Sequence, residues 1–352
     1  MQRVVLILAV TVLVTGSLGA GVLAAHWPFW QRAWQWHVAP TGWPSSMPGA
    51  VQVLHGGAGA RVLDVHVDEG LAAAIPANTQ ALLRAHADGR VDAWFAPGQD
   101  IHSLVDGRDL SALVLTPLFL QLASEHQGLL DAPLGAWLPQ WKEDRRGPIT
   151  PRQLFWQISG LPARHFTPLN PFRARAQLAS GPDFAYAALR WKPVWPPGSH
   201  FEASPVNAQL LALTAAAVAG TPFKSLLQEK LWTKVAVADA YAMLDHRGGD
   251  IAAHCCLRAS LGDWLRLGLL LAADGRGDGA RLWPAGSLGE KLAASPIHPG
   301  QGLGFDLLPR SGGQLLVATG TGRQLLIDPA TATVLLWVGE GAPPPGLARL
   351  LP

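Results

Sequence analysis

The sequence has little cysteine and little charge. Its two cysteines, Cys255 and Cys256, are adjacent in a chain of 352 residues. A bridge between neighbours is strained and uncommon, so the sequence favours two buried thiols over a redox-active pair. No disulfide framework is available to hold the fold. Charged residues make up only 15% and the formal net charge is +2, with no basic block. The sequence therefore implies no nucleic acid as a partner.

Charge is missing altogether from a stretch near the N-terminus. Residues Val4 to Ala25 carry none, and Arg3 precedes them. At about 1.5 Å per residue this stretch covers roughly 33 Å as a helix, the thickness of a bilayer core. Arg3 on the near side places the rest of the chain outside the cytoplasm. We therefore expect residues 1–25 to anchor an extracytoplasmic, periplasmic protein to the membrane. A cleaved signal peptide with small residues at Val22-Leu-Ala24 is the alternative.

Residues 26–50 are rich in tryptophan and proline, which is typical of a linker. Four tryptophans follow the apolar stretch directly, at positions 27, 30, 34 and 36. An indole ring suits the membrane interface, because it keeps its ring in the apolar zone and its N–H in water. Packing of these rings on the folded domain explains them equally well.

The remaining residues, 51–352, are numerous enough for one large core or two joined subdomains. Alternating polarity predicts strands at 79–86, 90–95, 314–317, 324–327 and 333–338. Helical periodicity predicts helices at 113–124, 206–219 and 261–273. Strands at both ends with helices between them predict an α+β fold. We expect an antiparallel sheet of five or more strands flanked by helices, with an all-helical subdomain at roughly 109–280.

Short segments resemble, in order and spacing, the penicillin-recognising family of class C β-lactamases, penicillin-binding esterases and 6-aminohexanoate-dimer hydrolases. They are Phe95-Ala-Pro-Gly-Gln-Asp100, Leu113–Leu122, Gln127–Pro139, Pro148–Leu154, Ile158-Ser-Gly-Leu-Pro162, Pro197-Gly-Ser-His-Phe201, Ala259–Gly268, Asp274–Leu282 and Gly320–Pro329. The resemblance spans roughly residues 80 to 340. It implies a β-lactamase/transpeptidase-like fold with a groove between the sheet and the helical subdomain. It also implies a serine hydrolase that acts on ester or amide bonds.

The reactive positions of that family are vacant here. A serine hydroxyl is a poor nucleophile unless a base takes its proton, and Ser-x-x-Lys puts the lysine on the serine's helix face. The aligned tetrad reads Asp109-Leu-Ser-Ala112. The family's Tyr-x-Asn loop relays protons, and here it reads Ala203-Ser-Pro205. The strand motif that begins with Lys or His and ends in Gly supports the oxyanion site. It reads Ala318-Thr-Gly320 and keeps only its glycine.

A shifted alignment does not recover these motifs. No Ser-x-x-Lys occurs at any of the six lysines, and neither of the two tyrosines begins a Tyr-x-Asn. Lys-Thr-Gly and Lys-Ser-Gly are absent. His55-Gly-Gly has the letters of His-x-Gly, but it lies far upstream of the place where the third motif belongs. We interpret it as a glycine-rich turn.

Few residues could replace the missing nucleophile or base. On a helix, Ser111 would point about 200° away from position 109, and the counterpart of Ser159 in active relatives is structural. Asp109 could attack or act as a base, but no partner base accompanies it, and a surface or capping role fits better. The histidines are scattered without metal-ligand spacing. We therefore expect no metal and no cofactor.

The sequence thus favours a catalytically inactive member of the family, an extracytoplasmic binding or scaffold protein. Its expected partners are the membrane, through the N-terminal helix, and a peptide, a cell-wall fragment or another protein in the groove. The groove-lining candidates are Asp109, Ser111, Ser204, Asn207 and Gly320. An active serine hydrolase with displaced catalytic residues is the alternative, and a decayed gene product that keeps its fold is a third reading.

Overall fold

A computed structural model describes residues 19–37, 51–58, 60–72, 75, 78–163, 172–277 and 280–352. The strands are β1 Val51–Leu54, β2 Asp64–Val67, β3 Thr79–Ala85, β4 Arg90–Phe95, β5 Leu104–Asp106, β6 Ala240–Met243, β7 Leu257–Ser260, β8 Asp306–Arg310, β9 Gly313–Gly320, β10 Arg323–Asp328 and β11 Thr333–Gly339. The α-helices are α2 Trp27–His37, α3 Glu69–Ala72, α4 Leu115–Glu125, α5 Pro151–Phe155, α6 Ala174–Ser180, α7 Phe184–Leu189, α8 Pro205–Ala219, α9 Phe223–Leu226, α10 Thr233–Val235, α11 Leu261–Ala272 and α12 Ser287–Lys291. Shorter turns of helix are η1 Arg108–Val114, η2 Leu129–Asp131, η3 Leu134–Ala136, η4 Pro139–Trp141, η5 Leu227–Trp232 and η6 Leu347–Leu350.

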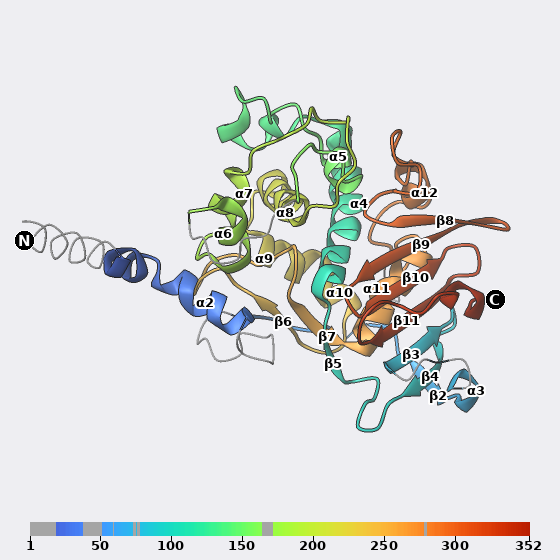
Figure 1. Cartoon of the computed structure of the whole chain (residues 1–352). Coiled ribbons are helices and arrows are strands. Elements are labelled where there is room, and N and C mark those ends of the chain that lie inside the picture. The colour runs from blue at the N-terminus through green and yellow to red at the C-terminus, as the bar shows by residue number, and fades with distance from the viewer. Residues whose placement is uncertain are drawn as a thin grey trace, which may run out of the picture.

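A seven-stranded sheet of order β2-β4-β3-β11-β10-β9-β8 forms one side of the molecule (Figure 1). All five predicted strands lie in it. Its central pairs are antiparallel, with Leu83 opposite Leu336 between β3 and β11. The expectation of a wholly antiparallel sheet is wrong at one edge, because β2 pairs with β4 in parallel. This edge strand has only four residues and its side chains are mostly exposed, so the sequence pattern did not identify it.

The sequence did not predict a second sheet, of order β1-β6-β7-β5. The expectation of an all-helical subdomain at roughly 109–280 is wrong, because strands β6 and β7 of this sheet lie within that range. Its strands have only three or four residues each, which is too short for alternating polarity to stand out. It brings β5, directly before the vacant nucleophile segment, beside β7, where Val105 pairs with Ala259. This small sheet thereby ties the start of that segment to the chain around residue 257.

Helices α4 to α10 form a helical lobe beside the large sheet (Figure 1). The predicted helix at 206–219 is confirmed as α8, which starts with Pro205 at its first turn and ends at Gly220 in the left-handed conformation. Most of α8 is buried. Helix α5 begins with a full capping box, in which Thr150 and Gln153 bond each other's backbone N–H.

The predicted helix at 113–124 is confirmed as α4, but its start differs from expectation. Residues Arg108–Val114 form a 3₁₀ helix, and the α-helix begins at Leu115. Pro117 lies in the first turn of α4. The first turn is the part of an α-helix that tolerates proline best. Pro117 therefore does not disturb the segment that carries positions 109 to 112.

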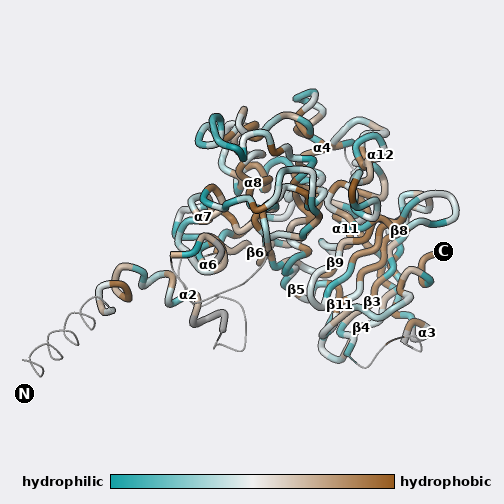
Figure 2. Tube along the Cα trace, turned by 45° about the horizontal axis from the view of Figure 1, so that its top comes forward, coloured by the Kyte–Doolittle hydropathy of each residue, from teal (hydrophilic) through white to brown (hydrophobic). Residues whose placement is uncertain are grey.

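Helix α11 lies against the large sheet, and its start and end match the predicted helix at 261–273 within one residue. Ser260 caps it by accepting from the N–H of Asp263. The helix comes so close to β11 that a Cβ at Gly268 would stand 2.7 Å from a methyl group of Val334. Figure 2 shows the hydrophobic residues concentrated along the central strands and the helices that cover them. One large apolar core joins the sheet to the helical lobe.

Near the N-terminus, α2 packs on the helical lobe through buried Phe29 and Ala33, which contact Ala176 of α6. Residues 19–25 are also helical and are largely exposed. Most of the predicted anchor and residues 38–50 of the expected linker lie outside the described residues. Within the described ranges no single helix is long and apolar enough to cross a membrane. Two consecutive helical segments, Pro205–Ala219 and Phe223–Val235, are together long and apolar enough, but the chain bends by 81° between them.

Candidate active site

Positions 109 and 112, which the sequence aligns with the family's nucleophile and base, lie on the 3₁₀ helix that precedes α4. Asp109 is exposed and Ala112 is half-buried. A 3₁₀ helix has three residues per turn, so positions 109 and 112 share a face. The family's nucleophile and base would share this face if they were present. Asp109 is the only ionisable side chain of this tetrad.

The third motif lies against the first. A Cβ added at Gly320 would stand 3.0 Å from the Leu110 nitrogen and 3.5 Å from the Asp109 Cβ. Only glycine permits this close approach, which explains why the motif keeps its glycine. Both the N–H and the hydroxyl of Thr321 lie 3.4 Å from Asp109 Oδ2. Ala318, two residues earlier on β9, is buried and supplies no charge.

Beneath these two motifs lies a charged cluster of Asp106, Arg108, Arg258 and Arg323. Burial raises the pKa of Asp106, and the three arginines oppose that rise. Arg323 is only 9% exposed, and its burial lowers its pKa to about 10, with Arg108 acting in the same direction and Asp106 against it. Arg323 Nε donates to the Asp106 carbonyl at 3.1 Å. Three cations and two carboxylates, Asp106 and Asp109, leave this part of the site with a positive balance.

The second motif occupies the turn before α8. Ala203 and Pro205 are exposed, whereas Ser204 is 5% exposed and its hydroxyl has no hydrogen-bond partner among the described residues. Gln157 joins the turn to the preceding loop by accepting from the N–H of Ser204 at 3.0 Å. It also accepts from Asn207 Nδ2 at 2.7 Å. The turn is therefore held by amide groups, without a phenol or a base.

The structure separates the groove candidates into two groups. Asp109 and Gly320 adjoin each other, while Ser204 and Asn207 belong to the hydrogen-bonded group around Gln157. Within the described part of the chain no hydrogen bond connects the two groups.

Two groove-lining predictions are corrected, for Ser111 and Asn207. Ser111 is 2% exposed and its Oγ accepts from the N–H of Leu257 at 3.0 Å. Asn207 is fully buried and accepts from the Ser159 hydroxyl at 2.7 Å. Both side chains point into the protein because buried backbone and hydroxyl donors require acceptors there. The structural interpretation of Ser159 agrees with this bond. Asp109 is exposed, so an accessible surface does include one of the candidates.

The cysteine prediction is also corrected. The sequence favoured two buried thiols, but the structure joins Cys255 to Cys256 by a disulfide. Cys256 adopts a positive φ of 72°, in a turn that enters β7. This unusual backbone conformation cannot be foreseen from the sequence. The turn leads directly to Leu257, whose N–H binds Ser111.

Among the described residues the arrangement holds charge, but it shows neither a metal-ligand cluster nor a serine paired with a base. No group of three or more histidine, cysteine, aspartate or glutamate side chains in the described ranges could hold a metal ion. Each serine near the motifs lacks a hydrogen-bonded base among the described residues: Ser111 bonds a backbone N–H, Ser159 bonds an amide, and the Ser204 hydroxyl has no partner. What remains beside Asp106 and Asp109 is a cluster of three arginines, of which Arg108 is exposed, Arg258 is half-buried and Arg323 is buried.

The charged cluster was missed in the sequence. Arg108 adjoins the vacant tetrad in sequence, but Arg258 and Arg323 are far from it along the chain. Arg323 follows Gly320 by three residues, and its position on the strand next to β9 was the one available signal. Their convergence depends on the pairing of β5 with β7 and of β9 with β10, which short-range patterns do not predict.

The fold is similar to that of several solved structures. A protein described as a 6-aminohexanoate-dimer hydrolase from Bacillus anthracis superposes with a TM-score of 0.68 at 16% identity, covering 90% of each chain. A family VIII carboxylesterase gives a TM-score of 0.61 at 16% identity, covering 77% of this chain and 90% of its own. A penicillin binding protein from Bacillus halodurans gives 0.56 at 14% identity, covering 75% and 93%. Likenesses at such identities establish the fold alone.

Comparison of sequences gives the family directly. No curated protein matches the chain. The family model described as Beta-lactamase matches residues 113–351, which is more than half of the chain and begins just after the vacant tetrad. The resemblance noted in the sequence is thus confirmed at the level of family and fold. The chain belongs to the beta-lactamase family of serine-hydrolase-fold proteins.

Proposed function

We propose that this protein is a catalytically inactive member of its family, which uses the former substrate groove as a binding surface. One observation carries the proposal. The segments aligned with two of the family's motifs, Asp109-Leu-Ser-Ala112 and Ala318-Thr-Gly320, adjoin in the structure. They contain neither the serine and lysine of the first motif nor the Lys or His of the third. Members of such a catalytic unit act together, and loss of one typically costs several orders of magnitude in rate. All are replaced here.

The charge of the site supports a ligand with a carboxylate. Arg108, Arg258 and Arg323 lie close enough to act on the Asp106 carboxyl, and guanidinium groups pair well with carboxylates. Asp109 at the rim adds an acceptor for a donor group of the ligand. A peptide or a cell-wall fragment offers both an anionic end and amide donors. We propose ligands of this kind for the groove.

This role is tested by isothermal titration calorimetry of the full chain with soluble muropeptides from digested cell wall. We expect saturable binding that weakens as salt rises, because charge contributes to it. Arg108→Gln should weaken binding roughly tenfold, in keeping with the loss of one charged hydrogen bond. Arg349→Gln, a surface change in η6 at the C-terminal end, is the matched control and should bind as the parent does. Equal affinity of the two variants, or no binding at all, would refute the groove as the ligand site.

An active hydrolase with displaced chemistry is the second candidate, and Ser204 is the observation that favours it. Its buried hydroxyl has no partner within the described residues and sits in the turn that aligns with the family's tyrosine motif. Hydrolysis of a p-nitrophenyl ester by the full chain, compared with Ser204→Ala, examines this reading. We expect both rates to equal background. A parent rate above background that the substitution abolishes would establish Ser204 as a nucleophile.

We also propose that the chain is tethered to a membrane, with its folded domain outside the cytoplasm. The support is the uncharged stretch from Val4 to Ala25 and the exposed apolar helix at residues 19–25, which extends away from the body (Figure 1). An exposed helix that is apolar all round is stable only in an apolar environment. Flotation of the full chain with phospholipid vesicles tests the tether. Recovery of the protein in the lipid-free fraction would contradict it.

A further inference from the structure

Helix α2 is fixed to the helical lobe by one buried cation. Arg32 is 3% exposed. It donates to the carbonyl of Gly181 at 2.9 Å and to the carbonyl of Asp245, and it lies 5.5 Å from the ring centroid of Phe184. Burial lowers its pKa to about 10, and the negative charge of Asp245 opposes that shift. A buried charge of this kind is costly unless it is well paired, so the pairing fixes where α2 sits.

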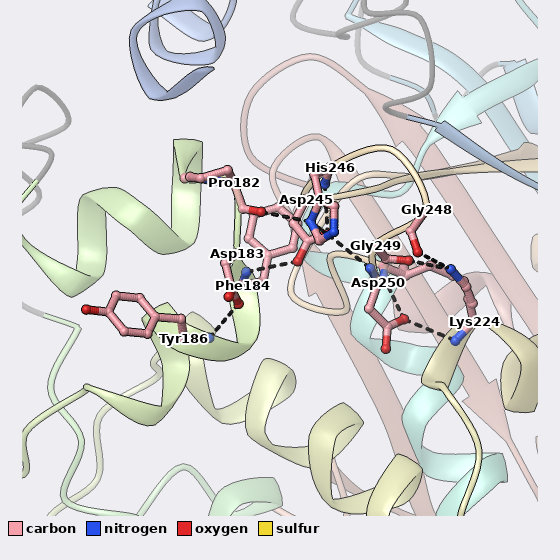
Figure 3. Close-up of polar contacts among 12 residues, drawn as sticks. Pro182, Asp183, Phe184, Tyr186, Lys224, Asp245, His246, Gly248, Gly249 and Asp250 are labelled. Carbon is pink, nitrogen blue, oxygen red and sulfur yellow. Dashed lines mark hydrogen bonds and ion pairs between the residues drawn. The ribbon is translucent and has the colours of Figure 1, made fainter. Parts of the chain in front are cut away.

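The receiving side of this contact is rigid. Asp245 is 4% exposed, and its carboxylate accepts from three backbone N–H groups, of Phe184 at 3.1 Å, His246 at 2.8 Å and Asp250 at 3.0 Å (Figure 3). His246 Nδ1 also lies 2.9 Å from the carbonyl oxygen of Pro182. The loop at 245–250 is thereby tied to the start of α7. Arg32 thus docks on a preformed site, and we name Arg32 with Asp245 the latch.

The surface around the start of α2 is aromatic and basic. Trp27 is 56% exposed and Phe172 is 65% exposed. The ring of Phe172 stands edge-on to that of His26, with centroids 5.1 Å apart. Arg173, the next residue, is exposed. Large exposed aromatic side chains beside a basic residue are unusual on a protein surface that meets only water. We name Trp27, Phe172 and Arg173 the collar.

We propose that the collar rests in the headgroup region of the bilayer, and that the latch holds the helical lobe in this orientation. This inference rests on the membrane tether proposed above. Helix 19–25 is the last part of the uncharged stretch Val4–Ala25 and is followed directly by His26 and by Trp27 of the collar. Tryptophan and phenylalanine favour the interface, and arginine favours anionic headgroups. The groove would then face the periplasm at a fixed angle to the membrane rather than turn freely on a linker.

Depth-dependent quenching tests the collar. The full chain with Phe172→Cys, labelled with an environment-sensitive fluorophore, is reconstituted in phosphatidylethanolamine and phosphatidylglycerol vesicles that contain a headgroup nitroxide lipid. Val67→Cys is the matched control, because Val67 is 69% exposed on β2, on the opposite side of the molecule from α2 (Figure 1). The unsubstituted chain gives the background from Cys255 and Cys256. We expect quenching at position 172 to be at least three times that at position 67.

The outcomes separate the inference from the tether. Equal quenching at both positions, in protein that floats with the vesicles, would overturn the collar and leave the tether intact. Failure to float would overturn both. Arg32→Met, which keeps most of the side-chain volume but loses both carbonyl contacts, should lower quenching at position 172 to the level at position 67 without changing flotation. Unchanged quenching in that variant would overturn the latch.

Discussion

Ser111 Oγ accepts a hydrogen bond from the backbone N–H of Leu257 at 3.0 Å. The bond joins the vacant nucleophile segment to the first residue of β7. A second backbone bond runs in parallel, from the N–H of Gly107 to the carbonyl of Leu257 at 2.8 Å. Ser111, the serine of the vacant tetrad, is thus a structural residue that holds the 3₁₀ helix in place.

The first prediction concerns this bond. Ser111→Ala removes the acceptor and leaves a buried N–H without a partner, which typically costs about 1–3 kcal/mol. We expect the free energy of unfolding to fall by that amount in urea titration. Labelling by any serine-directed probe should not change. A variant as stable as the parent would show that the bond contributes nothing, and a loss of labelling would identify Ser111 as reactive.

The second prediction concerns Asp263, whose side chain is fully buried. It accepts from the backbone N–H groups of Val237 and Ala238, from the Ser260 hydroxyl, and from Arg266 at 2.8 Å. Asp263→Ala leaves these donors without an acceptor and should lower the free energy of unfolding by about 3–5 kcal/mol. Glu125→Ala breaks the half-exposed pair with Lys230 and should cost under about 1 kcal/mol. Thermal and urea unfolding of both variants decides this, and similar losses would contradict the account.

The third prediction concerns pH. Burial lowers the pKa of His254 from 6.5 to about 4; its ring packs edge-on against Phe184 and its Nδ1 lies 3.1 Å from Gln209 Oε1. The folded state therefore prefers the neutral ring. As pH falls from 6.5 toward 4, the unfolded chain takes up a proton that the folded chain does not, so stability is lost across this window. His254→Gln should lose less stability there than the parent does. Parallel stability curves for the two proteins would show that His254 is not responsible.

The fourth prediction restores chemistry. Positions 109 and 112 share a face of the 3₁₀ helix, so Asp109→Ser combined with Ala112→Lys recreates a serine beside a base. General-base assistance typically contributes about 10²–10⁴ in rate. We expect the double variant to react with a fluorophosphonate at least 10²-fold faster than Asp109→Ser alone. Equal rates would mean that the 3₁₀ segment does not bring the two side chains together.

Much of the fold could be predicted from the sequence, because the polarity pattern of a long segment indicates which of its residues are buried. Helix α11 and strand β11 have apolar patterns over most of their length, and their predicted bounds hold within one or two residues. Strands β1 and β5 have three or four residues each and form only because tertiary pairing holds them. No local pattern predicted them.

The site could be predicted in part. Motif spacing named Asp109 and Gly320 as groove-lining candidates, and the two residues adjoin in the structure. The burial of Ser111 and Asn207 depends on which face of each segment meets the core, and this is set by the 3₁₀ start of α4 and by the loop at Gln157. Arg258 and Arg323 reach the cluster through strand pairing. Spacing alone does not carry such information.

The most direct test of the central claim is reaction of the full chain, in detergent, with a fluorophosphonate and with a fluorescent penicillin, read by intact mass. The full chain is used because α2 packs on the helical lobe. We predict no adduct under conditions that label an active class C β-lactamase completely. A stoichiometric adduct on this protein would contradict the account, and the modified residue would identify a working nucleophile.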